Sequence, residues 1–239
     1  MRPRRRRILA GIATAMVLVV VSGVAFVLTY RPDRARFPVR GIDVSHHQGD
    51  IDWSRVAGDD VQFAYIKASE GGDFRDQAFA RNWNAAGRAE IRRGAYHFFT
   101  LCRPGADQAA NLLAAMPPDA DALPPAVDLE FLGNCRTASR MTPIDLRREL
   151  KAFLDLVEKR TGQPTLLYLT QEFDDAYQVS ANFDRPLWLR RIVLEPKFGS
   201  RPWTLWQASN FRRRDGINGR VDWNVARLTW PPQPPHSKP

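Results

Sequence analysis

The sequence predicts an α/β protein. We expect an irregular (β/α) barrel of the TIM type, with eight strands and with helices mainly in its first half, preceded by an N-terminal transmembrane helix. Eight short runs rich in β-branched and aromatic residues recur along the chain, helix-like stretches separate the early runs, and a long uncharged segment lies near the N-terminus. Strands that alternate with helices favour a parallel sheet, and eight such strands favour its closure into a barrel.

The N-terminal segment combines a basic head with an apolar stretch. Residues 1–7 hold five arginines, and residues 8–30 hold no charge. This uncharged stretch is long enough for a helix to cross a bilayer. The arginines are expected to stay in the cytoplasm. A single-pass protein would then place its remaining chain outside the membrane, after a linker over residues 31–40. A secreted protein with a cleaved signal peptide is the alternative.

The formal net charge of +9 is concentrated at the N-terminus. Residues 1–40 hold nine arginines and one aspartate, so they carry +8 and the rest of the chain carries +1. Because a nucleic-acid binder needs a basic face on its own domain, we expect no nucleic-acid partner. The dense basic run Arg212-Arg213-Arg214 is interpreted as a solvated loop, with an anionic polymer as the alternative partner.

Residues 41–229 are expected to form one monomeric domain with a single core, followed by a proline-rich tail over residues 230–239. Its predicted strands, in chain order, are Gly41–Ser45, Gln62–Ala68, Gly94–Phe99, Pro125–Phe131, Thr165–Leu169, Leu187–Arg191, Thr204–Ala208 and Arg220–Asn224.

Three helices are predicted among these strands. Residues 76–89 carry apolar or small side chains near helical spacing, and residues 105–116 are rich in Ala and Leu. The clearest helical pattern covers residues 142–160, whose apolar side chains fall on one face. Thr142 is its expected N-cap and Gly162 its end. From residue 165 onward the links are short, which predicts an irregular second half.

Two acids, Asp128 and Glu130, lie in one short apolar run. Residues i and i+2 of a strand point to the same face, about 6.5–7 Å apart at the backbone. Two negative charges at so short a distance repel each other, so both carboxyl groups do not ionise readily. One of them can therefore keep its proton near neutral pH. A protonated acid beside a carboxylate is the pair that cleaves a glycosidic bond. The alternative is a pair of solvated acids at a strand end.

Two further acids extend this pair. Asp43 lies in the first predicted strand and Asp222 in the eighth, and these strands are neighbours in a closed barrel. Because active sites of such barrels lie at the carboxyl ends of the strands, we expect all four acids to meet in one cleft.

Aromatic side chains and histidines on or beside the predicted strands are further candidates for the site. Aromatic rings on the predicted strands either cover sugar rings or pack in the core; they are Tyr65, Tyr96, His97, Tyr168, Trp188 and Trp206. His46 and His47 are adjacent on an extended segment and so point to opposite sides. With four histidines and two cysteines in the chain, we expect neither a metal nor another cofactor.

Six motifs in chain order resemble glycoside hydrolase family 25, the Chalaropsis-type muramidases, or lysozymes, of bacteria, phages and fungi. They span residues 40–225 and read Gly41-Ile42-Asp43-Val44-Ser45-His46-His47-Gln48-Gly49, Ile66-Lys67-Ala68-Ser69-Glu70-Gly71, Gly94-Ala95-Tyr96-His97-Phe98-Phe99, Val127-Asp128-Leu129-Glu130, Leu205-Trp206-Gln207 and Val221-Asp222-Trp223-Asn224.

The resemblance implies an irregular barrel that hydrolyses the β-1,4 bond between N-acetylmuramic acid and N-acetylglucosamine of peptidoglycan. It implies Glu130 as the general acid, Asp128 as the partner that orients the 2-acetamido group, and Asp43 and Asp222 as flanking acids. The positions implied to line the groove are Tyr96, Tyr168, Trp206 and Gln207, with Lys67 and Glu70 close by and Tyr65 as a further candidate.

Both retention and inversion of configuration at the anomeric carbon stay open, because the separation of an i, i+2 carboxyl pair falls near the values typical of each. The resemblance favours the acetamido-assisted route.

Two features depart from the family pattern. Arg190 stands where many relatives carry a small residue, and it would narrow the groove or contact an acidic stem peptide. Cys102 and Cys135, which should flank the active-site face, are expected to form a disulfide in an exported protein.

Three rival functions follow from the same residues. A catalytically weak cell-wall-binding protein would use the same barrel but need not keep four acids. A chitinase-like glycosidase would carry a longer acidic run on the fourth strand. A metal-dependent deacetylase conflicts with the histidine spacing.

Overall fold

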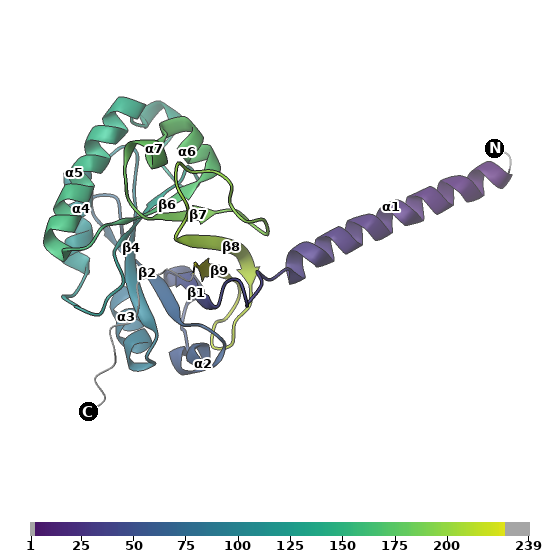
Figure 1. Cartoon of the computed structure of the whole chain (residues 1–239), viewed down its shortest axis with the longest axis horizontal. Coiled ribbons are helices and arrows are strands. Elements are labelled where there is room, and N and C mark those ends of the chain that lie inside the picture. Colours follow the sequence, from purple (N-terminus) through teal and green to yellow (C-terminus); the bar gives the residue numbers. More distant parts are fainter. Residues whose placement is uncertain (1–2, 228–239) are drawn as a thin grey trace.

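Eight strands form a closed barrel, as predicted. The computed structural model describes residues 3–227, so the predicted tail and the last two residues of the predicted domain lie outside the described residues. Around the barrel the order is β1, β9, β8, β7, β6, β5, β4 and β2, and β1 pairs with β2 to close the sheet (Figure 1). The strands are β1 (Val39–Val44), β2 (Phe63–Glu70), β4 (Arg92–Phe98), β5 (Ala126–Leu129), β6 (Leu166–Thr170), β7 (Leu187–Arg190), β8 (Leu205–Arg212) and β9 (Val221–Ala226), with the short β3 (Phe74–Arg75) at the edge of β2.

The last strand of the barrel runs in the opposite direction to the others. β9 is antiparallel to both β8 and β1, because residues 213–220 between β8 and β9 are too few for the crossover that a parallel pair requires. The first residues of β9 therefore lie at the edge where β1 ends, and Asp222 pairs in register with Asp43.

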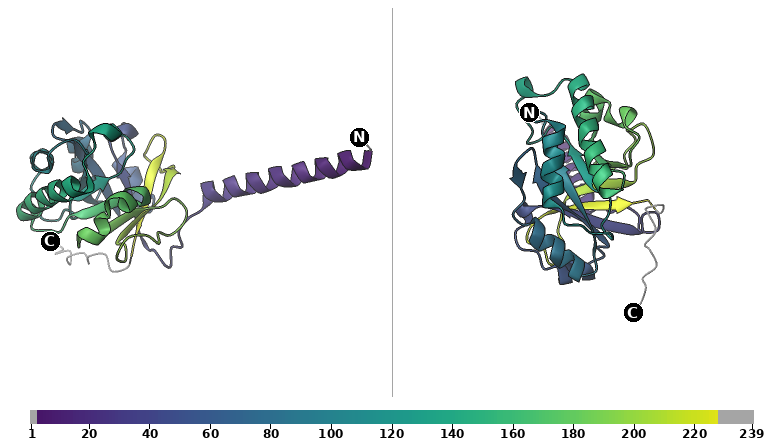
Figure 2. Two further views of the ribbon diagram at one scale, coloured as in Figure 1. Left: turned by 90° about the horizontal axis from the view of Figure 1, so that it is seen from above. Right: turned by 90° about the vertical axis from the view of Figure 1, so that its left-hand side faces the viewer.

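The three predicted helices are present. They are α3 (Phe79–Arg88), α4 (Gly105–Ala115) and α5 (Pro143–Thr161). The Thr142 hydroxyl accepts a hydrogen bond from the Asp145 amide at 3.2 Å, and Gly162 ends α5 with a φ of 69°, a left-handed conformation that glycine adopts without steric cost. Figure 2 shows α4 and α5 covering one side of the barrel. The remaining helical pieces of the barrel domain are short: α2 (Trp53–Gly58), α6 (Gln171–Tyr177), α7 (Val179–Asn182) and the 3-10 turns η1 (His46–Gln48) and η2 (Thr137–Ser139).

Buried side chains form two apolar clusters, one inside the barrel and one between the sheet and the helices. Alternate residues of each strand supply the two clusters, since strand side chains alternate faces. Gly94 makes room inside the barrel, because a Cβ there would collide with the ring of Tyr65. The packed interior supports the site at the ends of the strands.

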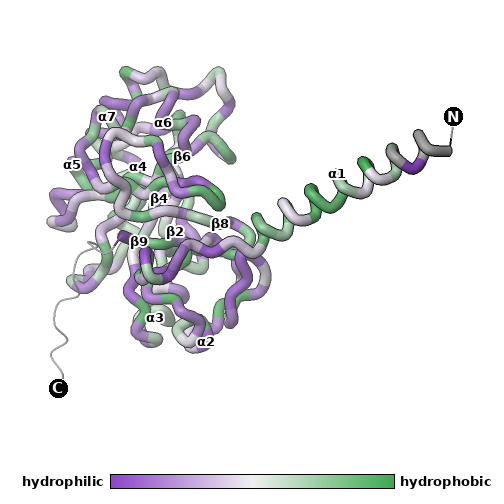
Figure 3. The backbone as a smooth tube through the Cα atoms, turned by 45° about the vertical axis from the view of Figure 1, so that its right-hand side comes forward, coloured by the Kyte–Doolittle hydropathy of each residue, from purple (hydrophilic) through white to green (hydrophobic). Residues whose placement is uncertain are grey.

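The N-terminal helix α1 (Pro3–Thr29) projects away from the barrel (Figures 1 and 2). Its segment Leu9–Thr29 is long and apolar enough to cross a membrane, with a mean hydropathy of 2.5, and Figure 3 shows its mainly hydrophobic colouring next to the mixed colouring of the barrel backbone. A signal sequence near an N-terminus can meet the same criteria of length and hydropathy.

Candidate active site

All four predicted acids line one cleft of about 370 Å³ at the edge of the barrel where β1 and β5 end. β1 contributes Asp43, β5 contributes Asp128, the residue after β5 is Glu130, and β9 contributes Asp222. The rest of the lining is Val44, Ser45, His47, Gln48, Lys67, Glu70, Tyr96, Phe98, Leu132 and Gly133.

Two amide side chains hold Asp43 in place. Its Oδ2 accepts hydrogen bonds from Asn224 Nδ2 at 2.7 Å and from Gln207 Nε2 at 3.3 Å. Trp188 Nε1 donates to Asn224 Oδ1 and the Tyr168 hydroxyl donates to Gln207 Oε1, both at 2.8 Å, so each amide presents its nitrogen to the carboxylate. Burial raises the pKa of Asp43 to about 6, and these hydrogen bonds lower it.

Asp222 faces Asp43 across the β1–β9 pair. Burial, the charge of Asp43 and a hydrogen bond to it raise the pKa of Asp222 to about 9, while Arg190 lowers it. Two carboxyl groups that share a hydrogen bond cannot both ionise cheaply. At neutral pH Asp222 therefore carries the proton of this pair, and Asp43 carries the charge.

Asp128 and Glu130 form the second pair. Burial and the charge of Glu130 raise the pKa of Asp128 well above its ordinary value, and Asp128 Oδ1 is buried without a hydrogen-bond partner among residues 3–227. Burial raises the pKa of Glu130 to about 7, with Arg190 lowering it and Asp43 raising it. The pair thus places Glu130, a carboxylic acid that can keep its proton near neutral pH, beside Oδ1 of Asp128, a hydrogen-bond acceptor without a partner among the described residues.

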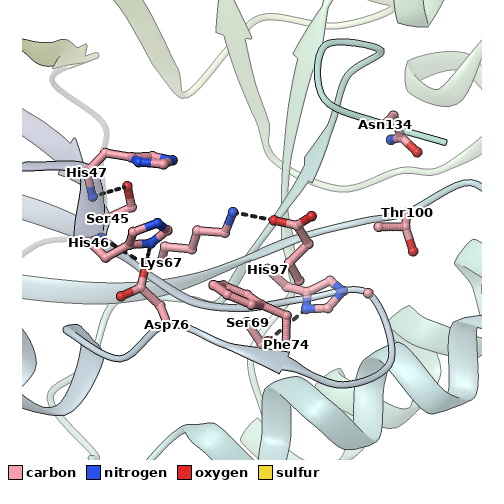
Figure 4. A network of polar contacts seen from close by, with 12 residues as sticks. Ser45, His46, His47, Lys67, Ser69, Phe74, Asp76, His97, Thr100 and Asn134 are labelled. Atoms are coloured by element: carbon pink, nitrogen blue, oxygen red, sulfur yellow. Dashed lines mark hydrogen bonds and ion pairs between the residues drawn. The ribbon is translucent and has the colours of Figure 1, made fainter.

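A cation and aromatic rings form the wall of the cleft on the side of β2 and β4. Lys67 Nζ lies 2.6 Å from Glu70 Oε2 and 5.2 Å and 5.6 Å from the ring centres of Phe98 and Phe74. Figure 4 shows Lys67 with its ion pair and the ring of Phe74 close by. The ion pair and the rings together hold the Lys67 ammonium at the cleft.

His46 and His97 belong to hydrogen-bond networks within the protein. His46 and His47 lie together in the turn η1, with ring centres 4.1 Å apart, and not on opposite sides of an extended segment as predicted. His46 Nδ1 lies 2.8 Å from Asp76 Oδ2, and the buried His97 contacts Ser69 Oγ at 2.8 Å (Figure 4). Within residues 3–227 no group of three or more His, Cys, Asp or Glu side chains is placed to hold a metal ion.

The rim beside Glu130 is cross-linked. A disulfide joins Cys102 to Cys135, with Cα atoms 6.1 Å apart. The neighbouring Asn134 donates from Nδ2 to the carbonyls of Phe99 and Glu130, both at 2.9 Å. The loops after β4 and β5 are therefore joined next to the candidate acid.

Only some of the residues predicted to line the groove do so. Tyr96, Lys67 and Glu70 line the cleft. Tyr168 and Gln207 lie beneath it, behind Asp43. Tyr65 is fully buried and its hydroxyl donates to the Pro124 carbonyl. Trp206 is also fully buried, packs in the cluster outside the sheet and donates from Nε1 to the Arg191 carbonyl at 2.7 Å.

The outward position of Trp206 follows from strand alternation, since its neighbour Gln207 points inward to Asp43. Asn224 belongs to a predicted motif without a predicted role, and Trp188 was predicted only as an aromatic residue on a strand. The signal for both was available, because each lies at an inward-facing position of its strand.

A larger hollow of about 530 Å³ lies between the segment before α2 and the β8–β9 connection. Asp52, Arg55, Asp215 and Gly216 are among its lining residues, and none of the four acids lies there. The smaller cleft is the candidate active site, because it is a concave pocket lined by carboxyl groups whose pKa values are shifted.

Paired carboxyl groups with separated pKa values, in a cleft at the strand ends of a barrel, are typical of a glycoside hydrolase. Residues 42–217 match the family model described as glycosyl hydrolases family 25. Lysozyme M1 of Streptomyces globisporus is 34% identical over 199 residues, covering 78% of this chain and 67% of its own.

Solved structures agree with this match. A family 25 glycosyl hydrolase from Bacillus anthracis is 34% identical with a TM-score of 0.77, covering 82% of this chain and 92% of its own. The bacterial lysozyme from Streptomyces coelicolor is 32% identical with a TM-score of 0.73, covering 79% of this chain and 91% of its own. The chain belongs to glycosyl hydrolase family 25 and is a glycosidase.

Proposed function

We propose that this glycosidase is a peptidoglycan hydrolase that cleaves the β-1,4 bond between N-acetylmuramic acid and N-acetylglucosamine. The observation that carries the proposal is the placement of Glu130 and Asp128 side by side in one cleft, together with the pKa of about 7 for Glu130. The relatives named as lysozymes support peptidoglycan as the substrate.

Glu130 acts as the general acid in this proposal. Its protonated carboxyl donates a proton to the glycosidic oxygen as the bond between that oxygen and the anomeric carbon breaks. A pKa near the working pH suits this role, because the group must hold a proton and still release it readily.

Asp128 acts on the 2-acetamido group of the muramic acid residue. Its buried Oδ1 has no hydrogen-bond partner among residues 3–227, so it is available to accept the acetamido N–H. The acetamido oxygen then attacks the anomeric carbon as the leaving group departs. Water subsequently adds to that carbon, the Glu130 carboxylate takes its proton, and the acetamido group is restored with configuration retained.

The remaining cleft residues bind the sugar chain. Tyr96 and Phe98 supply flat apolar surface at the cleft, and aromatic rings cover sugar faces with little loss of conformational entropy. Asp43 is the charged acid of its pair and lines the same cleft, so its charge favours the positive charge that develops at the anomeric carbon in the transition state. Asp222 keeps the proton that the two share.

The location proposed for this activity is the outer side of the cytoplasmic membrane. α1 would span the bilayer with residues 1–7 in the cytoplasm, as the positive-inside rule predicts. A tethered enzyme reaches only nearby polymer, which favours remodelling of the wall of its own cell.

Analysis of the reducing ends released from purified peptidoglycan tests the proposed function. Borohydride reduction followed by mass spectrometry identifies the sugar at the new reducing end. We expect muramitol, the reduced form of a muramic acid terminus. Glucosaminitol in its place would identify cleavage of the other glycosidic bond and would refute the proposal.

A further inference from the structure

The chain that follows α1 is packed against the barrel. Phe37 is only 5% exposed, and its ring centre lies 5.5 Å from that of Trp203 and 5.9 Å from that of Trp206. The buried Arg40 hydrogen-bonds the carbonyls of Phe37 and Pro32. The expected linker over residues 31–40 is therefore held on the domain by an apolar anchor and a buried guanidinium.

The end of α1 itself touches the domain. Arg212, at the end of β8, donates from Nη1 to the Leu28 carbonyl at 3.3 Å, and Tyr30 packs against the outer apolar cluster. The last carbonyls of a helix have no partner within the helix, so Arg212 satisfies one of them. If α1 spans the bilayer, the barrel surface around this contact lies at the membrane.

That surface carries more positive charge than the protein neutralises. Arg34 pairs with Asp60 at 3.0 Å and Arg36 with Glu195 at 2.9 Å, both as largely exposed arginines. Arg31, Arg212 and Arg213, which lie in or beside the same segments, have no carboxylate at ion-pair distance within residues 3–227.

Arg212 is the least satisfied of these arginines. It is 7% exposed, and its Nε and Nη2 have no hydrogen-bond partner among residues 3–227. Burial lowers its pKa, and the charges of Arg31 and Arg214 lower it further. A buried cation without a counter-charge is costly, so an anion close to this surface would stabilise it.

An exposed apolar side chain lies on the same surface. Leu194 is 56% exposed and adjoins Glu195, which pairs with Arg36. Basic side chains and an exposed leucine in the segments that follow or contact the end of an apolar helix are typical of a surface that contacts lipid headgroups.

We propose that a basic face, made of the exposed Arg31, Arg34, Arg36 and Arg213 beside the buried Arg212, binds the anionic headgroups of the membrane that α1 spans. The inference rests on the proposed membrane anchor. The expectation of a solvated loop over Arg212-Arg213-Arg214 is wrong, because Arg212 is buried at the end of β8 and Arg214 stacks on Trp223; the inference assigns the exposed Arg213 of this run to the membrane surface. The barrel would then be held in one orientation, with its cleft at a fixed height above the bilayer.

Hydrogen exchange of the full chain in lipid nanodiscs tests this inference. Discs of phosphatidylcholine alone are compared with discs that also contain phosphatidylglycerol, at low and at high salt. Peptides covering residues 30–37 and 211–215 should exchange about fivefold more slowly in the anionic discs for each arginine engaged, the factor that corresponds to about 1 kcal/mol. High salt should remove the difference, and α5 should show none.

The double variant Arg31→Gln/Arg213→Gln should lose most of this protection. Its matched control is Arg88→Gln/Arg160→Gln, which removes two exposed arginines from α3 and α5, on the sides of the barrel away from α1 (Figure 1). The control should keep the protection.

Three results would overturn the inference in different ways. Equal exchange in both kinds of disc, with the chain inserted, rejects the basic face and leaves the anchor intact. Absence of the chain from the disc fraction rejects both. Protection by soluble poly(glycerol phosphate) but not by phosphatidylglycerol assigns the face to a wall polymer instead of lipid.

Discussion

Asn224 on β9 donates a hydrogen bond from its side-chain amide to Oδ2 of Asp43 on β1, over 2.7 Å. The orientation of this amide is fixed from behind by the indole N–H of Trp188. The antiparallel strand therefore contributes the residue that keeps Asp43 charged, in addition to Asp222. The geometry makes Asn224 a positioning residue for the candidate site.

Asn224→Ala should impair both stability and activity. The Trp188 indole would lose its acceptor inside the protein, which costs about 1–3 kcal/mol of the free energy of unfolding. The pKa of Asp43 would rise, because a hydrogen bond that lowers it is lost, so the acidic limb of the pH–activity profile should move to higher pH. Denaturant unfolding and a pH–kcat/KM profile measure the two effects.

The control for that variant is Asn218→Ala, which truncates an exposed asparagine in the β8–β9 connection. It should leave stability and the pH profile unchanged. An Asn224→Ala enzyme with the wild-type acidic limb would show that the amide does not tune Asp43.

Arg190→Gln should extend activity to higher pH. The positive charge of Arg190 lowers the pKa of Glu130 from the value that burial would give, so its removal raises that pKa. A general acid must be protonated, and activity is lost as the pH rises through its pKa. The alkaline limb of kcat/KM should therefore move up by as much as about one pH unit. Arg191→Gln, one residue further along, serves as the control and should not move it.

Asp222→Asn should stabilise the fold while lowering activity. The folded-state pKa of Asp222 is about 9, above its unfolded value, so its contribution to stability is full at low pH and is lost as the pH rises toward 9. Asparagine mimics the protonated acid and removes this loss. The variant should gain about 1–4 kcal/mol at pH 7 and almost nothing near pH 4. Parallel stability curves for the variant and the wild type across this range would argue against a shared proton.

Reduction of the Cys102–Cys135 disulfide should destabilise the rim of the cleft. The bond closes a segment with a sequence separation of 33 residues, and loss of such a cross-link costs about 2–4 kcal/mol. A thiol assay on the denatured exported protein should find no free thiol, and reductant should lower the thermal midpoint. Two reactive thiols would contradict the pairing.

The sequence predicted the barrel well because its strands and main helices are local patterns. All eight β-rich runs became strands, and the periodic segment after Thr142 became α5 with the expected cap. The four acids were located because each lies at or beside a strand end. These features depend on side-chain alternation and capping, which neighbouring residues determine.

What the sequence did not predict depends on tertiary contacts. The reversed direction of β9 follows from the shortness of the preceding connection, but no local pattern marks it. The roles of Asn224 and Trp188 appear only when β1, β7 and β9 are neighbours. Trp206 was expected at the groove on resemblance, yet its strand position turns it toward the outer cluster. The packing of residues 31–40 on the barrel depends on Phe37, whose partners lie far away in the sequence.

The turnover of Glu130→Gln on peptidoglycan tests the central claim most directly. Glutamine keeps the shape of the side chain but has no proton to give at the glycosidic oxygen. We expect kcat/KM for release of soluble muropeptides to fall by about 10²–10⁴-fold, with the thermal midpoint equal to or above that of the wild type. Wild-type turnover by a folded Glu130→Gln enzyme would contradict the assignment of Glu130 as the general acid.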